Sequence, residues 1–518
     1  MEIKDATSHD EQPSIFEESK LHVLEGGSAA TTSHLYQEDS NGKVLDRLLL
    51  PRPTDDPNDP LTWSPRRKTT AVTSVCFFVF LSNYITLSIS PILISVIAEF
   101  DVSLDKGSYL VTFNLLFLGL GNLFWVPLSE KIGKRPVLLM CSGLFFVSSI
   151  WAAVAKSWGS LFGARIVQGF AASSCEALGL AVVADLFFLH ERGLWVGFYS
   201  LMFTVGSALG GVFAGLVASA TPNWRWVFWK NVILTGFLFL TVIVFQAETN
   251  FKRPVENESG EGLPSSALAA IRARADVRWV DSLSVTRGYD RNVSILWLWW
   301  RPWLTLQYPA VVWCSLVYGV CLGWLILQIN TNSSAFPQLY SFSPQAVGNI
   351  NLSYLVAALV GSAAGGPFSD WIIKFITRRH GGFFVPEYRL WCLIPPSIVA
   401  PVGLMLWGCG LEDRLNHMVP IVGTAITYGV LCAVPAVAMT YVVDSYRALA
   451  GETMTVLTAF KNTFAFGLSF AVFPWIAKDG FLKVSGYNLL IEGLLFSTTI
   501  PLYIYGARIR QWTNNFKI

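Results

Sequence analysis

Apolar blocks of about 20 residues recur along this chain, and no other feature limits its fold as strongly. A helix needs roughly 20 apolar residues to cross about 30 Å of hydrocarbon. Hydrophobic residues make up 53% of the 518 residues, and charged residues make up only 14%. Soluble domains carry roughly 25% charged residues. The sequence therefore predicts an all-α polytopic membrane protein, and it excludes a soluble enzyme, a disordered chain and a secreted disulfide scaffold.

The apolar blocks fall into two groups of six, separated by a long polar and basic stretch. The twelve predicted transmembrane helices cover residues 69–97, 107–129, 137–156, 160–184, 193–219, 227–246, 306–331, 346–370, 390–409, 418–443, 452–475 and 486–507. We expect two six-helix bundles, over residues 66–247 and 306–508, joined by a cytosolic linker loop over residues 248–305. Residues 1–65 are predicted to be a disordered acidic cytosolic tail, and residues 509–518 a second cytosolic tail.

The basic residues predict how the helices are oriented. If both termini are cytosolic, the cytosolic loops and flanks carry roughly three times as many Lys and Arg residues as the outer loops. We therefore expect cytosolic termini, and a plasma-membrane location because no endosomal or vacuolar address is evident. The net charge of +2 gives no reason to expect a nucleic acid as partner. A functional monomer is expected, because both six-helix halves are present in one chain.

Metal, cofactor and enzyme signatures are missing from the sequence. The eight cysteines form no CxxC pair, and none of the six histidines falls inside a predicted span. The sequence also contains no Ser-His motif and no phosphate-binding loop. We therefore expect no metal, no cofactor and no enzymatic activity.

A short motif recurs after the second predicted span of each half. The two copies are Val126-Pro-Leu-Ser-Glu130-Lys131-Ile-Gly133-Lys134-Arg135 and Gly366-Pro-Phe-Ser-Asp370-Trp-Ile-Ile-Lys374. Each copy combines a proline, a serine and an acidic residue with basic residues that follow. An internal repeat of this kind predicts two related bundles that face each other, the architecture of rocker-switch transporters.

The first copy resembles the loop signature of the major facilitator superfamily, Gly-x-Leu-x-Asp-Arg-x-Gly-Arg-Arg. The matching positions are Leu128, Glu130, Lys131, Gly133, Lys134 and Arg135. Two further segments resemble motifs of that superfamily, Arg165-Ile-Val-Gln-Gly169 and the antiporter-associated Gly206-Ser207-Ala-Leu-Gly210-Gly211, in which Ser207 replaces a proline. A finer resemblance, to fungal twelve-span drug:proton antiporter-like members, rests on Asp56-Pro-Asn-Asp-Pro-Leu-Thr-Trp63, Trp224-Arg-Trp-Val-Phe-Trp229, Glu248-Thr249 and Tyr441-Val-Val-Asp444-Ser-Tyr446.

The resemblance implies roles for the residues of these motifs. Gating of the cytosolic side is implied for Glu130, Lys131, Gly133, Lys134 and Arg135, and in the second half for Asp370, Lys374 and Asp444. The acidic residue Glu130 is expected to face the start of the eleventh span near Gly451, where the helix dipole favours a carboxylate by about 0.3–1 kcal/mol. Gly206, Gly210 and Gly211 are expected to let helices approach closely.

Three ionisable residues within the predicted spans are candidates for proton coupling or substrate binding. Arg165 needs partners, because a guanidinium at that depth costs at least about 2.5 kcal/mol; it is expected to act in coupling or as a clamp between helices. Glu176 lies eleven residues later on the same face of the fourth span. It is expected to exchange a proton, to bind a cationic substrate or to stay permanently protonated. Lys461, beside Asn462, is expected to contact an anionic substrate, to pair with a carboxylate such as Asp444, or to be structural.

Uncharged polar side chains at membrane depth have two possible roles. They can line a cavity that grips a drug-sized ligand, or they can hold helices together by hydrogen bonds. The candidates are Asn83, Tyr84, Asn114, Gln328 and Asn332.

These features predict a proton-coupled secondary transporter that exports a small organic molecule, a xenobiotic or a secondary metabolite, by alternating access. Its expected partners are the substrate, protons and the lipid bilayer. A proton-driven importer of a cationic nutrient such as a polyamine is the alternative within the same class. A non-transporting nutrient sensor is less favoured, because the predicted C-terminal tail is short.

Overall fold

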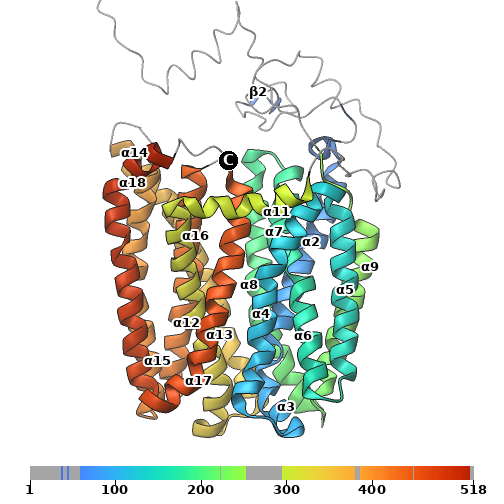
Figure 1. The fold of residues 1–518 in the computed structure, drawn as a ribbon, viewed down its shortest axis with the longest axis vertical. Helices are drawn as coiled ribbons and strands as arrows, with labels where there is room; N and C mark the ends of the chain where they lie inside the picture. Colours follow the sequence, from blue (N-terminus) through green and yellow to red (C-terminus); the bar gives the residue numbers. More distant parts are fainter. Residues whose placement is uncertain are drawn as a thin grey trace, which may run out of the picture.

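A computed structural model describes residues 37–38, 44–45, 56, 59–221, 223–251, 294–379, 385–446 and 449–513. Within this part of the chain, two short strands, β1 (Gln37–Glu38) and β2 (Val44–Leu45), pair antiparallel. The other described elements are helical, as predicted (Figure 1). Most of the predicted disordered tail over residues 1–65 and most of the predicted linker loop lie outside the described residues, whereas the last described helix continues to Thr513, within the predicted C-terminal tail.

The N-terminal bundle contains six segments that are long and apolar enough to cross a membrane. They are α2 (Pro65–Leu87) continued by η2 (Ser90–Ile92) and α3 (Leu93–Phe100), α4 (Leu104–Ile132), α5 (Lys134–Val154), α6 (Trp158–Ala172) continued by α7 (Ser174–Leu186), α8 (Leu189–Ala220) and α9 (Arg225–Phe245). A short turn, η1 (Pro60–Thr62), precedes α2 and is capped by the Asp59 carboxylate, which accepts a hydrogen bond from the Leu61 amide at 3.0 Å. Asp caps such turns well because its side chain satisfies an otherwise unpaired amide.

The C-terminal bundle follows α11 (Ile295–Leu304) and η5 (Thr305–Gln307). Its elements are α12 (Pro309–Tyr340), α13 (Pro344–Ala363) continued by η6 (Ala364–Phe368) and α14 (Ser369–Arg379), η7 (Pro386–Leu393) with α15 (Ile394–Glu412), α16 (Met418–Ser445), α17 (Ala450–Ser497) and α18 (Thr499–Thr513). In Figure 1, α11 and α14 lie at one end of the bundles and α3 lies at the other. We call these the α11 end and the α3 end.

The segment Gly451–Thr513 makes two crossings rather than one. Gly480 within α17 has φ 76° and ψ 171°, a conformation that only glycine adopts without strain. The ring of Trp475 stacks on that of Tyr487 with centroids 5.9 Å apart, although twelve residues of straight helix would separate them by about 18 Å. The chain therefore reverses at Gly480. Eleven helical segments in the described residues thus give twelve crossings, and the prediction of twelve transmembrane helices in two bundles is confirmed.

One predicted span ended too early. The seventh was expected to end at residue 331, but α12 continues to Tyr340. The polar side chains from Asn330 to Ser334 are buried, and some of them bond within the protein: the Ser333 hydroxyl donates to the Ile329 carbonyl at 2.8 Å. Burial against neighbouring helices lets a polar segment stay inside the bundle.

Close contacts between the two bundles lie toward the α3 end. Helix α8 packs on α13, and α4 packs on α17. A Cβ atom on Gly215 would lie 2.6 Å from the Pro344 carbonyl oxygen, so only glycine permits this approach. The Ser90 and Ser333 hydroxyls lie 2.5 Å apart across the same interface. The predicted packing glycines have different neighbours. Gly206 and Gly210 face α2 within the N-terminal bundle, and Gly211 faces Asn351 of α13 in the other bundle.

Candidate functional site

A buried ion pair joins the two bundles. The Glu176 Oε2 atom on α7 lies 3.6 Å from the Lys461 Nζ atom on α17, and each side chain is only 7% exposed. Lys461 also donates a hydrogen bond of 3.2 Å to the Tyr318 hydroxyl on α12 and lies 4.5 Å from the centre of that ring. Two residues that the sequence singled out separately are thus neighbours, and Tyr318, which it did not single out, completes their contact.

The polar groups at this interface are incompletely satisfied. Glu176 Oε2 is buried and has no hydrogen-bond partner among the described residues, so its contact with Lys461 is a long ion pair only. The neighbouring Asn462 Nδ2 is also buried without a partner in the described part of the chain. Asn462 lies against Gly119 of α4, where an added Cβ would come within 2.5 Å of the Asn462 Cβ. Buried polar groups with so few hydrogen-bond partners stabilise the present arrangement of the bundles only weakly. This favours a rearrangement of the interface.

Arg165 is held differently, inside the N-terminal bundle. Its guanidinium is fully buried and donates to the carbonyls of Leu110 at 3.1 Å, Ile85 at 3.3 Å and Thr86 at 3.0 Å. It also donates to the Gln168 side chain at 2.7 Å. These partners belong to α2, α4 and α6, and no ion pair forms between Arg165 and a carboxylate of the described residues. This geometry favours the expected alternative of a clamp between helices, and it separates Arg165 from Glu176.

Several of the other predicted polar residues bond to neighbouring helices. Asn114 Nδ2 donates to the Arg165 carbonyl at 2.8 Å and its Oδ1 accepts from the Thr86 hydroxyl at 3.1 Å. Gln328 donates to the Thr427 hydroxyl at 3.3 Å. Asn332 accepts from the Trp407 indole at 2.9 Å and donates to the Thr424 hydroxyl at 3.1 Å. These contacts favour the role of holding helices together.

Asn83 and Tyr84 lie on α2 and contact residues of the N-terminal bundle. The Asn83 side chain donates to the Val79 carbonyl one turn earlier on α2, at 3.0 Å. The Tyr84 ring stacks on Phe80 with centroids 5.7 Å apart, and the Lys230 ammonium lies 4.7 Å from its centre. A contribution of either residue to a substrate cavity stays a prediction.

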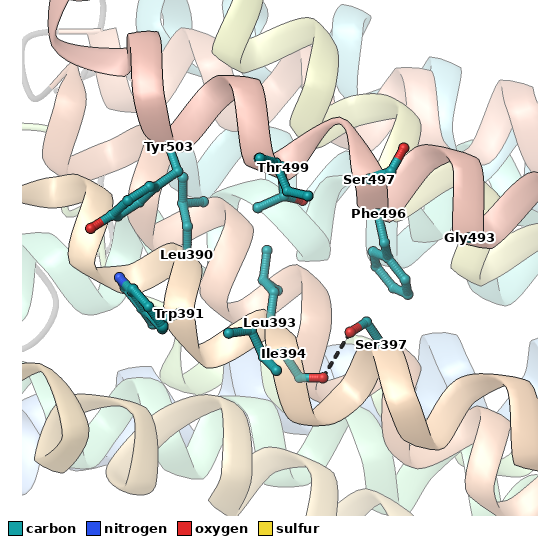
Figure 2. A pocket seen from close by; sticks show the side chains of 11 residues that line it. Leu390, Trp391, Leu393, Ile394, Ser397, Gly493, Phe496, Ser497, Thr499 and Tyr503 are labelled. Carbon is teal, nitrogen blue, oxygen red and sulfur yellow. Dashed lines mark hydrogen bonds between the residues drawn. The ribbon is translucent and has the colours of Figure 1, made fainter.

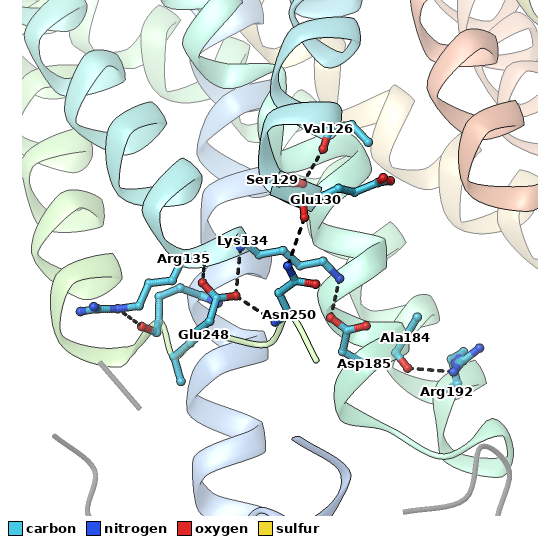
Figure 3. Close-up of polar contacts among 12 residues, drawn as sticks. Val126, Ser129, Glu130, Lys134, Arg135, Ala184, Asp185, Arg192, Glu248 and Asn250 are labelled. Carbon is cyan, nitrogen blue, oxygen red and sulfur yellow. Dashed lines mark hydrogen bonds and ion pairs between the residues drawn. The ribbon is translucent and has the colours of Figure 1, made fainter. Parts of the chain in front are cut away.

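The predicted gating loop of the first half is tied to the ends of α7 and α9 (Figure 3). The Lys134 ammonium pairs with the Asp185 carboxylate. The Lys134 and Arg135 amides donate to the two oxygens of Glu248, at 3.0 and 3.1 Å. The Arg135 Nε atom donates to the Gln246 carbonyl at 2.7 Å. The start of α5 is therefore anchored by charge-assisted bonds to two other helices.

Gly133 forms the turn before α5, and Glu248 accepts the hydrogen bonds that anchor the start of that helix. Gly133 connects α4 to α5 with φ 102°, in the region that favours glycine. Burial raises the pKa of Glu248, and hydrogen bonds from the Asn250, Lys134 and Arg135 amides oppose that rise. Glu130 and Lys131 are less buried at the end of α4. The expected contact of Glu130 with the start of the eleventh span stays a prediction.

The second half carries a matching cluster at the same end. The Arg389 guanidinium of η7 binds Asp444 at 2.5 Å and Asp370 at 3.1 Å, so it joins two predicted gating residues. No motif in the sequence distinguishes Arg389 from the other basic residues. Lys461 pairs with a carboxylate, as one of the expected alternatives has it, but that carboxylate is Glu176, whereas Asp444 binds Arg389. Lys374 lies exposed on α14.

A further buried carboxyl escaped the sequence analysis. Glu492 in the second arm of α17 is 5% exposed, and the Cys321 thiol of α12 lies 4.0 Å from its Oε1 atom. Its position inside the predicted span 486–507 was a signal that could have found it, because acids in transmembrane segments are rare. Glu492 is buried among helices of the C-terminal bundle, unlike Glu176.

Two cavities open within the C-terminal bundle, and neither is lined by Glu176 or Lys461. One of about 450 Å³ lies where α15 begins and α17 gives way to α18, with walls that include Trp391, Ile394, Phe496 and Tyr503 (Figure 2). The other, of about 560 Å³, lies among α13, α15 and α16. Pro395 and Pro396, at the start of α15, line the second cavity. Neither cavity combines charged groups with its apolar lining.

The two bundles, the repeated loop and the buried charges at the interface define a polytopic membrane transporter of the rocker-switch class. A family model described as Major Facilitator Superfamily matches residues 73–474, and the chain belongs to this superfamily. Its members are transporters, so the chain is not an enzyme.

Individual relatives support this assignment. The chain is 26% identical to an uncharacterized MFS-type transporter of Schizosaccharomyces pombe, over 90% of this chain and 89% of the relative. It is 27% identical to the MFS-type transporter atr4 of Stereocaulon alpinum, over 93% and 86% of the two chains. The solved structure of the proton:xylose symporter XylE matches with a TM-score of 0.59 and 14% identity, covering 86% of this chain and 96% of that one. At this identity the last similarity concerns the fold alone.

Proposed function

We propose that this protein is a proton-coupled secondary transporter that exports a small organic molecule, with Glu176 as the carboxyl that exchanges the proton. The observation that supports this proposal is the buried Glu176–Lys461 pair between the two bundles. A carboxylate at that position loses its charge when it binds a proton, and its attraction to Lys461 is then lost. Protonation would therefore change the contact between the bundles directly.

The rest of the interface gives this step a mechanical consequence. The bundles touch closely toward the α3 end, through Gly215 with Pro344 and Ser90 with Ser333. The ionised pair adds an attraction farther along α17 toward the α11 end. A proton that binds Glu176 removes this attraction and biases the bundles toward another arrangement. Tyr318 keeps a hydrogen bond with Lys461, so the ammonium retains one partner while its carboxylate is neutral.

The orientation and direction of transport belong to the same proposal. The α11 end carries the basic loops around Lys134 and Arg389, and under the positive-inside rule this supports a cytosolic location for that end and for both termini. Export from the plasma membrane follows the resemblance to drug:proton antiporter-like members. Glu130, Lys131 and Lys374 would gate the cytosolic end with the anchored loop residues, and the chain would act as a monomer.

Import of a cationic nutrient such as a polyamine is the second candidate. One observation favours it: the Glu176 oxygen nearest Lys461 has no hydrogen bond within the described residues, so a substrate ammonium could replace that of Lys461. In that case Glu176 would bind the substrate rather than the proton.

The test is transport by intact fungal cells that lack their own exporters. Cells that express the chain are loaded with labelled drugs, pigments and polyamines, with and without a protonophore, between pH 5 and 8. Loss of compound that the protonophore abolishes, and that Glu176→Gln also abolishes, supports proton-driven export. Uptake of a polyamine instead supports the second candidate. Glu492→Gln is the matched control, because it removes a buried carboxyl that lies within one bundle. Normal proton-driven export by Glu176→Gln would contradict the role given to Glu176.

A further inference from the structure

Helix α11 is apolar on both of its faces. Its sequence is Ile-Leu-Trp-Leu-Trp-Trp-Arg-Pro-Trp-Leu. Leu298 and Pro302 are buried against the protein. The opposite face exposes Leu296 (71%), Trp297 (50%), Trp300 (62%) and Trp303 (44%). A helix that is apolar all round is normally buried in a protein core or in a membrane. The exposed face of α11 therefore requires an apolar cover.

The depth of α11 identifies that cover. The Trp299 ring contacts the Phe124 ring of α4, with centroids 5.7 Å apart. Phe124 precedes the end of α4 at Ile132 by eight residues, or about 12 Å of helix. The 29 residues of α4 extend about 43 Å, which exceeds the roughly 30 Å of hydrocarbon. Helix α11, which runs across the bundles in Figure 1, therefore lies at the edge of the hydrocarbon, where tryptophan is enriched.

The charged side chain of α11 forms an ion pair within the protein. Arg301 is the only charged residue of this helix, and its Nη2 atom lies 2.9 Å from the Glu452 Oε1 atom at the start of α17. The outward face of α11 consequently offers indole and aliphatic groups and no cation. Such a face is suited to the boundary between headgroups and acyl chains, whatever the charge of the headgroups.

Helix α11 also reaches both bundles. Trp299 attaches it to α4 of the N-terminal bundle, and Arg301 attaches it to α17 of the C-terminal bundle. These two helices pack on each other across the bundle interface. A rearrangement of the bundles must therefore shift or strain the attachment of α11.

We propose that the face formed by Leu296, Trp297, Trp300 and Trp303 is a lipid-binding surface that seats α11 in the adjoining leaflet and couples both bundles to it. The partner is the interfacial zone of a bilayer, bound through apolar and indole contacts. The proposal does not depend on which substrate is carried.

The position of the surface can be measured on the full chain. Trp300→Cys is labelled with a fluorophore after Cys409 and Cys432, the half-buried native cysteines, are changed to serine. The protein is reconstituted into phosphatidylcholine vesicles with or without phosphatidylserine. We expect lipids with a spin label near the headgroup end of the chain to quench the fluorophore at least about threefold more than aqueous iodide. Both lipid compositions should give the same result. Stronger quenching by iodide, or seating only with phosphatidylserine, would overturn the proposal.

A second variant tests whether the tryptophans hold α11 in place. With the fluorophore at Trp303→Cys, Trp297→Ser/Trp300→Ser should raise quenching by iodide about threefold or more. Trp226→Ser/Trp229→Ser on α9 is the matched control, since these residues are also exposed and have no role in α11. Equal quenching in both double variants would show that the α11 face does not seat the helix. The assay reports position alone, so it stands apart from the transport experiment.

Discussion

Arg165 and Lys461 are both buried cations, but Arg165 lies inside one bundle and Lys461 lies between two. Arg165 binds three backbone carbonyls of the neighbouring helices α2 and α4 and the Gln168 side chain of its own helix α6. Lys461 has one long contact with Glu176 and one hydrogen bond with Tyr318. The partners of Arg165 are carbonyls and a side-chain amide that cannot change their charge, whereas the carboxylate of Glu176 can.

This difference indicates that, in a rocker-switch protein, one set of contacts can stabilise each bundle while another set changes when the bundles move. Several satisfied bonds inside a bundle keep it rigid in each state. A single, poorly satisfied pair between bundles can break at low cost when its charge changes. The same division appears at the α11 end, where Lys134, Arg135 and Arg389 bind carboxylates within their own bundles.

The largest effect is expected from removing the arginine inside the bundle. Arg165→Met removes the four hydrogen bonds that the buried guanidinium donates, and hydrogen bonds of charged groups contribute about 1.5–3 kcal/mol each. We expect little folded protein, and a strongly lowered melting temperature for what folds, in detergent unfolding assays. Arg192→Met is the control, because Arg192 is only partly buried at the start of α8. Equal stability of Arg165→Met and the unchanged protein would contradict the stabilising role given to Arg165 inside the bundle.

A smaller effect, with a distinct pattern, is expected at the interface. Lys461→Met leaves the Glu176 carboxylate buried and unpaired, which costs about 3–5 kcal/mol. The double variant Glu176→Gln/Lys461→Met removes both charges and should recover most of that stability. Thermal unfolding of the two single variants and the double variant measures this coupling. If the two losses simply add, the residues do not interact as described.

The smallest effect concerns the close packing of the bundles. A methyl group in Gly215→Ala would meet the Pro344 carbonyl, and such overpacking costs about 1–3 kcal/mol. We expect α8 and α13 to separate toward the α3 end, which raises labelling of Ser333→Cys by a membrane-impermeant maleimide. Gly210→Ala is the control on the same helix, because Gly210 faces α2. Increased labelling in Gly210→Ala but not in Gly215→Ala would contradict this division of the glycines.

Much of the candidate site was visible as isolated residues but not as contacts. Glu176 and Lys461 stood out because charges at membrane depth are costly. Spacing along one helix suggested that Arg165 and Glu176 share a site, but the Arg165 guanidinium donates hydrogen bonds to carbonyls of α2 and α4. Arg389 had no distinguishing signal, because positive charges are common near helix ends. Tyr318 lies inside the predicted span 306–331 and carries no charge that would mark it.

The fold class followed from the sequence alone, because the length of the apolar blocks and the cost of unpaired backbone in lipid favour membrane-spanning helices. The two halves followed from the repeated loop, and the resemblance to the superfamily followed from the motifs. Which charges meet became clear from the packing of the helices. Glu176 and Lys461 come from opposite halves of the chain, and no local pattern specifies a contact between them. Their pairing depends on how the two bundles pack across the interface, chiefly through α4 against α17 and α8 against α13.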